Sequence, residues 1–322
     1  MTVELTPGRW RGLKTTSLAD DNIFSILAFD QRGSYRRMLP DGTPYADAVK
    51  MKEEIVGTLT RYASAVLLDP TYGLGPAMQM TGKSGLVMAL EKSGYSGDDT
   101  ARKPQFVDTW TPEKIRTMGG SAVKLLVYYH PDTGHLAEEL EDLIREKTAE
   151  IHAVDLPVFL EPMSYSIDAD VSKDSAEFAA TKRHVVVETA RRLGKTGVDV
   201  LKMEFPLDYK YADRGEWREA CDELSEASDV PWVLLSAGVD FETFEEQTVV
   251  ACEAGASGFL AGRAIWKEAV NMMPEARTAF LDGTASERIQ RLIEISGEKA
   301  RPWSEFYTVP GSSEDWYDSY GE

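Results

Sequence analysis

The chain contains few of the residues that build disulfides or hold metal ions. Its two cysteines, Cys221 and Cys252, form no Cys-x-x-Cys motif, so neither a disulfide framework nor a metal knuckle is predicted, and we expect two buried thiols. The four histidines show no His-x-x-x-His or His-Glu-x-x-His spacing, and only His130 lies near the end of an expected strand. A zinc-dependent mechanism is therefore disfavoured, and no metal or other cofactor is expected.

Two further absences limit where the chain acts and what it binds. No apolar run approaches the roughly 18 residues of a membrane-spanning helix, and no basic segment followed by an apolar one begins the chain. We therefore expect a cytoplasmic protein that does not bind membranes. Cationic residues are also scarce, because 35 Lys and Arg face 54 Asp and Glu, which gives a formal net charge of −19. This charge disfavours nucleic acid as a partner, and an anionic small substrate would need a local basic pocket.

Short apolar runs alternate with helical patterns along most of the chain. Eight runs predict buried strands, at residues 23–29, 65–68, 85–90, 122–129, 156–161, 198–205, 232–235 and 258–261. A helix also fits residues 84–92. The alternation predicts an α/β fold, a (β/α)8 TIM barrel, as a single domain over residues 1–322. Residues 1–22 are expected to form a lead-in segment over one end of the barrel, and residues 303–322 an acidic, aromatic C-terminal tail.

One of these runs carries a lysine where a buried strand should carry no charge. Lys202 lies in the middle of residues 198–206, which end at a proline. Burial disfavours the ammonium form of lysine, and a neutral amine attacks carbonyl carbon to form a Schiff base. In a structural alternative, Lys202 pairs with Glu204, which lies two residues further on and so on the same face of the strand. This segment alone favours neither explanation.

Charged residues also lie in or after other expected strands. The C-terminal ends of the strands of a parallel barrel meet at one face, which carries the active sites of barrel enzymes. A second cation, Lys124, would help to keep Lys202 unprotonated, and Glu161 can relay protons. Each of these charges can also be explained as a buried ion pair or a helix cap. Together they predict a site made from Asp30, Lys124, Glu161, Lys202, Ser236 and Arg263.

Glycines follow the last two strands, where barrels frequently bind phosphate through backbone N–H groups. The segments are Ser236-Ala237-Gly238 and Gly262-Arg263. Glycine lets the backbone approach a ligand, and the guanidinium of Arg263 can bind an oxyanion with two parallel hydrogen bonds. A glycine after a barrel strand is otherwise a turn residue. The pattern predicts a binding site for an anionic group.

Seven motifs follow one another at the ends of the expected strands. They are AFDQRG (28–33), LLDP with YG (67–70 and 72–73), AVKLLVYY (122–129), FLE (159–161), DVLKME (199–204), LSAG (235–238) and GRAIW (262–266). In this order, over about residues 10 to 303, they resemble the class I tagatose-1,6-bisphosphate aldolase family, which also contains sulfofructose-phosphate aldolases.

The resemblance implies a Schiff-base aldolase, with Lys202 as the nucleophile and Glu161 as the acid and base. It also implies that Asp30, Gln31 and Lys124 contact the ketose. An acidic group of the substrate would be held by Ser236, Gly238, Gly262 and Arg263. The chain departs from the family in residues 94–110, 163–173 and 208–214 and in the tail, and the first three of these can line the substrate end.

The sequence therefore predicts a class I aldolase that cleaves a ketose bisphosphate, such as tagatose 1,6-bisphosphate, to dihydroxyacetone phosphate and glyceraldehyde 3-phosphate. Three alternatives remain open. They are a sulfofructose-phosphate aldolase that releases sulfolactaldehyde, a transaldolase-type transfer, and a catalytically silent sugar-phosphate sensor on the same barrel. The expected partners are a small sugar phosphate or sulfosugar phosphate and further copies of the chain in a homo-oligomer.

Overall fold

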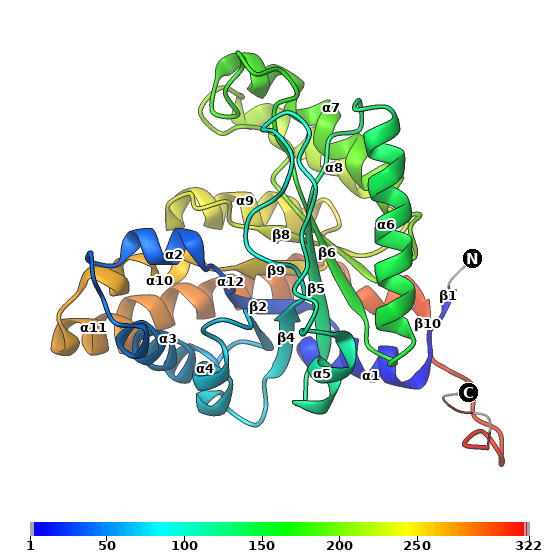
Figure 1. The fold of residues 1–322 in the computed structure, drawn as a ribbon, viewed down its shortest axis with the longest axis horizontal. Helices are drawn as coiled ribbons and strands as arrows, with labels where there is room; N and C mark the ends of the chain where they lie inside the picture. The colour runs from blue at the N-terminus through cyan, green and yellow to red at the C-terminus, as the bar shows by residue number, and fades with distance from the viewer. Residues whose placement is uncertain (1–2, 319, 321–322) are drawn as a thin grey trace.

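A closed barrel of eight parallel strands forms the centre of the computed structural model, which describes residues 3–318 and 320 (Figure 1). Each strand pairs with the next along the chain, and the last pairs with the first. The strands are β2 (Phe24–Phe29), β3 (Ala65–Leu68), β4 (Gly85–Ala89), β5 (Ala122–Tyr128), β6 (Val158–Met163), β7 (Val200–Met203), β8 (Trp232–Leu235) and β9 (Gly258–Ala261). The predicted barrel is confirmed, and residues 85–89 form a strand and not a helix.

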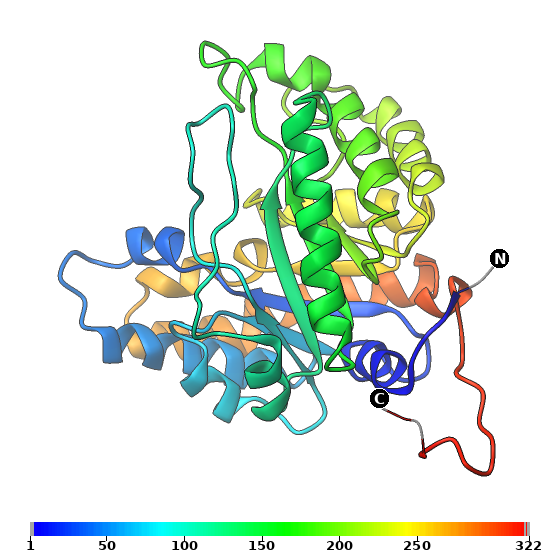
Figure 2. The same ribbon diagram turned by 45° about the vertical axis from the view of Figure 1, so that its right-hand side comes forward.

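Helices between the strands cover the outside of the barrel (Figures 1 and 2). They are α2 (Gly33–Met38), α3 (Tyr45–Leu59), α4 (Leu74–Gln79), α5 (Pro112–Thr117), α6 (His135–His152), α7 (Ala176–Leu193), α8 (Trp217–Ala227), α9 (Phe241–Glu253), α10 (Arg263–Trp266), α11 (Pro274–Phe280) and α12 (Ser286–Lys299). Leu27 and Phe29 belong to the large hydrophobic cluster between strands and helices, whereas Ile26 and Ala28 belong to the smaller cluster inside the barrel. The strand period of two residues produces this alternation.

The same period directs the candidate site residues inward. Members of the interior cluster on four strands are Ala28, Ala122, Phe159 and Val200. Two residues after each of these, on the same face of its strand, the chain has Asp30, Lys124, Glu161 and Lys202. The apolar interior of the barrel therefore gives way to charged side chains at the C-terminal end of the strands.

The opposite end of the barrel is closed by the two ends of the chain. Helix α1 (Pro7–Thr16) lies across it, and β1 (Val3–Glu4) pairs with β10 (Tyr307–Thr308). Trp303 is fully buried, with its ring centroid 4.8 Å from that of Trp10 and 6.4 Å from that of Phe24. Apolar packing around Trp303 therefore fills the interior of the barrel at its N-terminal end.

A long two-armed loop, residues 91–106, projects from the end of β4 (Figure 2). We call it hairpin 91–106, because two antiparallel bridges join its arms. The guanidinium of Arg102 packs over three aromatic rings, with its Cζ 4.5 Å from the ring centroid of Tyr95, 5.2 Å from that of Tyr128 and 5.3 Å from that of Tyr165. These cation–π contacts attach the hairpin to the ends of β5 and β6.

A buried ion pair supports the end of β2 from outside the barrel. The Lys52 Nζ, on α3, lies 2.6 Å from Asp69 Oδ2, and both side chains are fully buried. The same ammonium donates to the carbonyl oxygens of Phe29 at 2.8 Å and Gln31 at 3.0 Å, which flank Asp30 in the chain. Burial lowers the pKa of Lys52, and the Asp69 carboxylate opposes this effect. The pair thus fixes the backbone that carries Asp30.

Replacement of Lys52 should show what this pair contributes. We expect Lys52→Met to lower the free energy of unfolding by about 3–5 kcal/mol, because it leaves the Asp69 carboxylate buried without a cation. The double variant Lys52→Met/Asp69→Asn should regain part of this loss, since it leaves no charge behind. Urea unfolding of the three proteins measures both effects. A double variant less stable than Lys52→Met would contradict this electrostatic explanation.

Candidate active site

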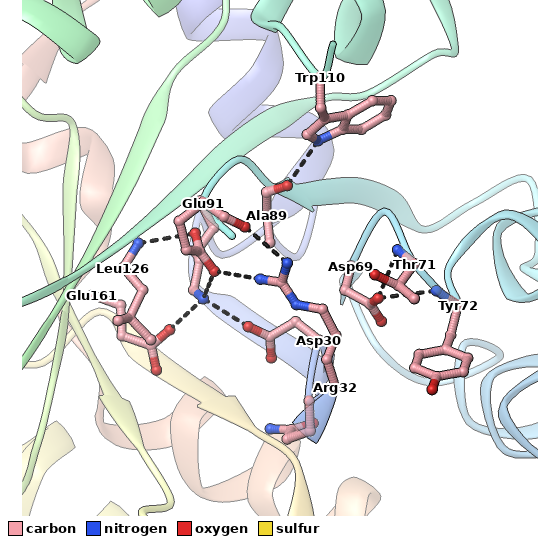
Figure 3. Close-up of polar contacts among 12 residues, drawn as sticks. Asp30, Arg32, Asp69, Thr71, Tyr72, Ala89, Glu91, Trp110, Leu126 and Glu161 are labelled. Carbon is pink, nitrogen blue, oxygen red and sulfur yellow. Dashed lines mark hydrogen bonds and ion pairs between the residues drawn. The ribbon is translucent and has the colours of Figure 1, made fainter. Parts of the chain in front are cut away.

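Charged side chains from β5, β6, β7 and the end of β2 form one cluster at the C-terminal end of the barrel. Lys202 Nζ lies 2.7 Å from Glu161 Oε1, and Lys124 Nζ lies 2.8 Å from Glu161 Oε2. Lys124 Nζ also lies 2.7 Å from Asp30 Oδ2 (Figure 3). The exposed fractions of these four side chains lie between 1% and 9%. Glu161 therefore bridges the two lysines that the sequence singled out.

One oxygen of this bridging carboxylate retains acceptor capacity. Glu161 Oε2 is buried and, among the described residues, has no partner in hydrogen-bond geometry, although the Lys124 ammonium is close to it. The side-chain oxygen Oε1 of Gln31 is likewise buried without a partner within the described chain. Buried polar atoms are normally hydrogen-bonded, so both oxygens can accept a hydrogen bond from a ligand hydroxyl, and the carboxylate oxygen of Glu161 can also accept its proton.

The sequence analysis did not identify Glu91, which belongs to the same cluster. Its Oε1 lies 3.0 Å from Lys124 Nζ and 3.0 Å from Arg32 Nη2, and its Oε2 accepts a hydrogen bond from the Leu126 N–H at 3.1 Å (Figure 3). Glu91 follows β4, the strand for which a helix also fitted. The sequence feature that pointed to Glu91 was its position at the end of an expected strand. This feature is informative only if residues 85–90 are assigned as a strand.

The three carboxylates fix the protonation state of Lys124. Burial alone would lower the pKa of Lys124, but Asp30, Glu161 and Glu91 together raise it well above its ordinary value. Burial alone would raise the pKa of Asp30, and the ammonium groups of Lys124 and Lys202 outweigh it, so that the pKa lies below its ordinary value. These shifts favour Lys124 as a cation and hydrogen-bond donor and Asp30 as an anion at neutral pH.

The structural alternative for Lys202 is wrong, because Glu204 has other partners. Glu204 Oε2 accepts hydrogen bonds from the N–H and the hydroxyl of Ser164, and its Oε1 lies 2.8 Å from Lys173 Nζ. Burial alone would raise its pKa, but Lys173 and Lys182 lower the pKa of Glu204 to about 2. Glu204 therefore connects β7 to the loop after β6, and Lys202 forms its ion pair with Glu161 instead.

The predicted anion site lies at the ends of β8 and β9. Arg263 has no ion-pair or hydrogen-bond partner within residues 3–318 and 320, and a Cβ on Gly238 would lie only 2.9 Å from its Cζ. Gly238 has a φ of 89°, and Ala237 has a φ of 46°, which is rare for a residue with a side chain. Gly262 allows close packing of β9 on β2, because a Cβ there would lie 2.5 Å from the Ala28 oxygen. Ser236 is buried beside them.

A cavity of about 460 Å³ opens onto the cluster. Of the predicted residues, those that line it are Asp30, Gln31, Lys124, Glu161 and Arg263. Lys202 is not part of its wall and joins the site through Glu161. Ala237 and Gly238 line a neighbouring cavity of about 240 Å³, together with Lys173, Lys182 and Glu204. Neither cavity wall includes Ser236 or Gly262, which lie at the strand ends.

Comparison with known proteins assigns the family. Residues 24–268 match the model of the DeoC/LacD family aldolases. The chain is 34% identical over 328 residues to tagatose 1,6-diphosphate aldolase 2 of Streptococcus pyogenes serotype M3, which covers 95% of this chain and 99% of that protein. This chain belongs to the DeoC/LacD aldolase family. It is an aldolase, a carbon–carbon lyase, and tagatose 1,6-diphosphate aldolase of Lactococcus lactis is similar to it at 34% identity over 313 residues, 89% of this chain and 95% of that protein.

Solved structures share the fold of this aldolase. A fructose-bisphosphate aldolase from Plasmodium falciparum superposes with a TM-score of 0.66 at 14% identity, covering 93% of this chain and 98% of that one. An archaeal fructose 1,6-bisphosphate aldolase gives a TM-score of 0.56 at 18% identity, covering 87% of this chain and 98% of that one. At these identities the likeness supports the barrel fold.

Three further observations concern membrane-spanning helices, metal sites and the two cysteines. Within residues 3–318 and 320, no helix is long and apolar enough to cross a membrane. No group of three His, Cys, Asp or Glu side chains in that part of the chain converges to hold a metal ion. Cys221 and Cys252 are buried free thiols, as expected, and burial raises the pKa of Cys252 to about 12.

The pKa of Glu204 predicts how stability depends on pH. Its folded-state pKa of about 2 lies below the ordinary value of 4.5, so its contribution is fully present above about pH 4.5 and declines as the pH falls toward 2. The stability difference between the wild type and Glu204→Gln should therefore shrink by about 2 kcal/mol between pH 6 and pH 3. Urea unfolding across this range measures it, with the exposed Glu226→Gln as control. A difference that does not change with pH would contradict the prediction.

Proposed function

We propose that this aldolase uses Lys202 as a Schiff-base nucleophile and cleaves a ketose 1,6-bisphosphate to dihydroxyacetone phosphate and glyceraldehyde 3-phosphate. The observation that carries the proposal is the bridge from Lys202 through Glu161 to Lys124, of which Glu161 and Lys124 line the cavity. A nucleophile in contact with a proton acceptor, which a second group holds in place, is the arrangement that covalent catalysis needs. The curated relatives are named tagatose 1,6-diphosphate aldolases, which suggests the substrate.

Glu161 can carry the proton transfers of Schiff-base formation. Glu161 takes a proton from the Lys202 ammonium, 2.7 Å away, and the amine so formed attacks the ketone carbon to give a carbinolamine. Glu161 then returns a proton to the carbinolamine hydroxyl, which leaves as water, so that an iminium ion joins Lys202 to the sugar. The positive nitrogen is an electron sink, and the next bond to break lies one carbon further along the sugar.

Cleavage of the carbon–carbon bond and release of the product use the same two side chains, Lys202 and Glu161. Glu161 takes the proton of the hydroxyl on the carbon beyond the breaking bond, the carbon–carbon electrons move to the iminium nitrogen, and the aldehyde leaves with an enamine behind it. The Lys124 ammonium, held by Asp30 and Glu91, stabilises the negative charge that develops on the sugar oxygen. Protonation of the enamine carbon and addition of water then release dihydroxyacetone phosphate and restore the amine.

Arg263 is the proposed ligand of the phosphate on the ketone half. Its guanidinium has no ion-pair partner within residues 3–318 and 320, and it follows β9, which β8 alone separates from β7 and Lys202. Its packing against Gly238 places it beside a backbone with two residues at positive φ, where successive N–H groups can face an anion. Ser236 and Gly262 would complete this site.

An assay of product release tests the proposal and its alternatives. The protein is incubated with ketose 1,6-bisphosphates, with sulfofructose phosphate, and with each ketose in the presence of an acceptor aldose. Release of dihydroxyacetone phosphate from the bisphosphates supports the proposal. Preferred cleavage of the sulfosugar, or transfer to the acceptor without release, would support one of the other aldolase-type reactions instead.

Trapping by borohydride should identify the nucleophile. With dihydroxyacetone phosphate and sodium borohydride, we expect the wild-type protein to gain one reduced substrate adduct, which peptide mass spectrometry locates on Lys202. Lys202→Met should gain none, whereas Lys83→Met, at an exposed lysine on the opposite end of the barrel, should gain it in full. An adduct that persists in folded Lys202→Met would assign the nucleophile to another lysine.

Glu161→Gln should separate proton transfer from binding. It keeps the shape and hydrogen-bonding capacity of the side chain but removes the base, so we expect kcat to fall by about 10²–10⁴-fold with little change in affinity for dihydroxyacetone phosphate. Steady-state kinetics and calorimetry measure the two quantities, and Glu226→Gln at an exposed position serves as the control. Unchanged turnover in the folded variant would leave Glu161 with a structural role only.

A further inference from the structure

Two cavities meet at Met163, the last residue of β6. The active-site cavity of about 460 Å³ has Met163 in its wall, and so does the neighbouring cavity of about 240 Å³. We call this smaller cavity the annex, and its wall also includes Lys182 on α7, Glu204 after β7 and Gln247 on α9. Of the described residues, Met163 alone is common to the two walls. It therefore forms part of the partition between the cavities.

The side chain of Met163 lies on the inner face of β6, beyond Glu161. Phe159 belongs to the cluster inside the barrel, and Glu161 and Met163 follow it at steps of two residues on the same face. Met163 thus lies about 6.6 Å further than Glu161 toward the open end of the barrel. Its carbonyl oxygen accepts a hydrogen bond from the Tyr129 N–H at 3.0 Å, which fixes its backbone against the end of β5. A sugar whose hydroxyl meets Glu161 would therefore place its next carbons against Met163.

The annex adjoins the place where the sugar would react. Its wall includes residues at the ends of β6, β7 and β8, which are Met163, Glu204 and Leu235. Lys202 lies on the middle one of these three strands, two residues before Glu204, and its Nζ lies 2.7 Å from Glu161 in the wall of the other cavity. The proposed nucleophile is thus close to both cavities, although it lines neither. An opening at Met163 would therefore lie beside the reacting carbons.

Two polar side chains in the wall of the annex form fewer hydrogen bonds than they can. Gln247 is only 4% exposed, and its amide forms no hydrogen bond within the described part of the chain. The Lys182 ammonium donates only to the carbonyl oxygen of Leu207, at 3.2 Å, and has no ion-pair partner among residues 3–318 and 320. Because buried polar groups are normally hydrogen-bonded, the annex suits hydroxyl groups better than an apolar chain.

We propose that Met163 closes the annex to the substrate and so limits the length of the aldehyde half to that of glyceraldehyde 3-phosphate. This inference rests on the proposed function and identifies the residue that sets the size of the sugar. In the wild-type protein the methionine side chain occupies the passage beside Glu161. A shorter side chain joins the two cavities, and a longer aldehyde then places its added CH(OH) group in the annex, near Gln247 and Lys182.

Condensation of dihydroxyacetone phosphate with aldehydes of different length tests the proposal. Glyceraldehyde and erythrose differ by one CH(OH) group, and neither carries a phosphate. We expect the wild type to favour glyceraldehyde in kcat/KM by about 10-fold or more, because a filled wall rejects an added carbon by about that factor. Met163→Ala should raise the value for erythrose by about 10-fold and change the value for glyceraldehyde by less than about threefold. Equal changes for both aldehydes, or no change for either, would overturn the proposal.

Further methionine variants provide a graded series and a control. Met163→Leu conserves the side-chain volume and should keep the wild-type preference. Met163→Val removes fewer atoms than Met163→Ala and should shift the preference less, in the same direction. Met78→Ala, at a methionine on α4 that is 66% exposed, should behave as the wild type. A shift in Met78→Ala as large as that in Met163→Ala would contradict the role of the partition.

A second substitution locates the added group of the longer aldehyde. Gln247→Leu keeps the approximate size of the side chain but removes its amide. In the Met163→Ala background it should reduce the gain for erythrose by about threefold or more, since it removes a hydrogen-bonding partner of the added hydroxyl. A gain that persists in full would place the added carbon outside the annex, and the proposal would fail.

Binding of compounds that cannot react separates this inference from the proposed function. Calorimetry compares a hexitol 1-phosphate with a heptitol 1-phosphate, which have no carbonyl group. The wild type should bind the hexitol phosphate more tightly, and Met163→Ala should bind the two with equal affinity. If no ketose is cleaved or formed but this difference is present, the proposed function fails and the role of Met163 stands. Equal binding of both compounds to the wild type would overturn that role whatever reaction the enzyme catalyses.

Discussion

The buried ammonium of Lys124 is the charge on which the organisation of the site depends. It lies within 3.0 Å of carboxylates from three different strand ends, those of Asp30, Glu91 and Glu161. None of these acids is stable in an apolar interior without a cation, and the cation is not stable without them. The same contacts orient Glu161 so that its other oxygen meets Lys202. The position of the proton acceptor proposed for Lys202 is thus a consequence of a charge balance that the fold itself requires.

The barrel maintains this balance with supports placed outside the cavity. Lys52 holds the two carbonyl groups that flank Asp30, and Glu204 joins β7 to the loop after β6 through Ser164 and Lys173. In both supports a buried carboxylate, Asp69 or Glu204, pairs with a lysine. Such pairs are poor sources of net stability but fix geometry, because removal of the lysine leaves an uncompensated buried charge. They help to position Asp30 and Lys202, although none of their side chains lines the 460 Å³ cavity.

The sequence predicted the barrel and most of the cluster for a physical reason. Buried strands of a parallel barrel are continuous apolar runs, so a lysine or glutamate inside one, as at Lys124, Glu161 and Lys202, stands out against its neighbours. Glu91 had no such contrast, since it begins a polar segment where charge is ordinary. The ion-pair partners could not be predicted from the sequence either. Glu204 has the spacing to pair with Lys202, but it forms its ion pair with Lys173, a loop residue distant in sequence. An alternating pattern shows on which face of a strand a side chain lies, but only the three-dimensional structure shows which residue lies next to it.

The attachment of hairpin 91–106 has a consequence for how such enzymes diversify. Beyond Glu91 at its base, the hairpin is attached to the ends of β5 and β6 through one arginine and three tyrosine rings, and it forms no ion pair with Lys124, Glu161 or Lys202 within the described chain. Residues 92–105 can therefore accumulate substitutions, insertions or deletions while the charge balance of the barrel stays intact. Changes in this loop can thus reshape one wall of the cavity while the ion pairs at the strand ends stay in place.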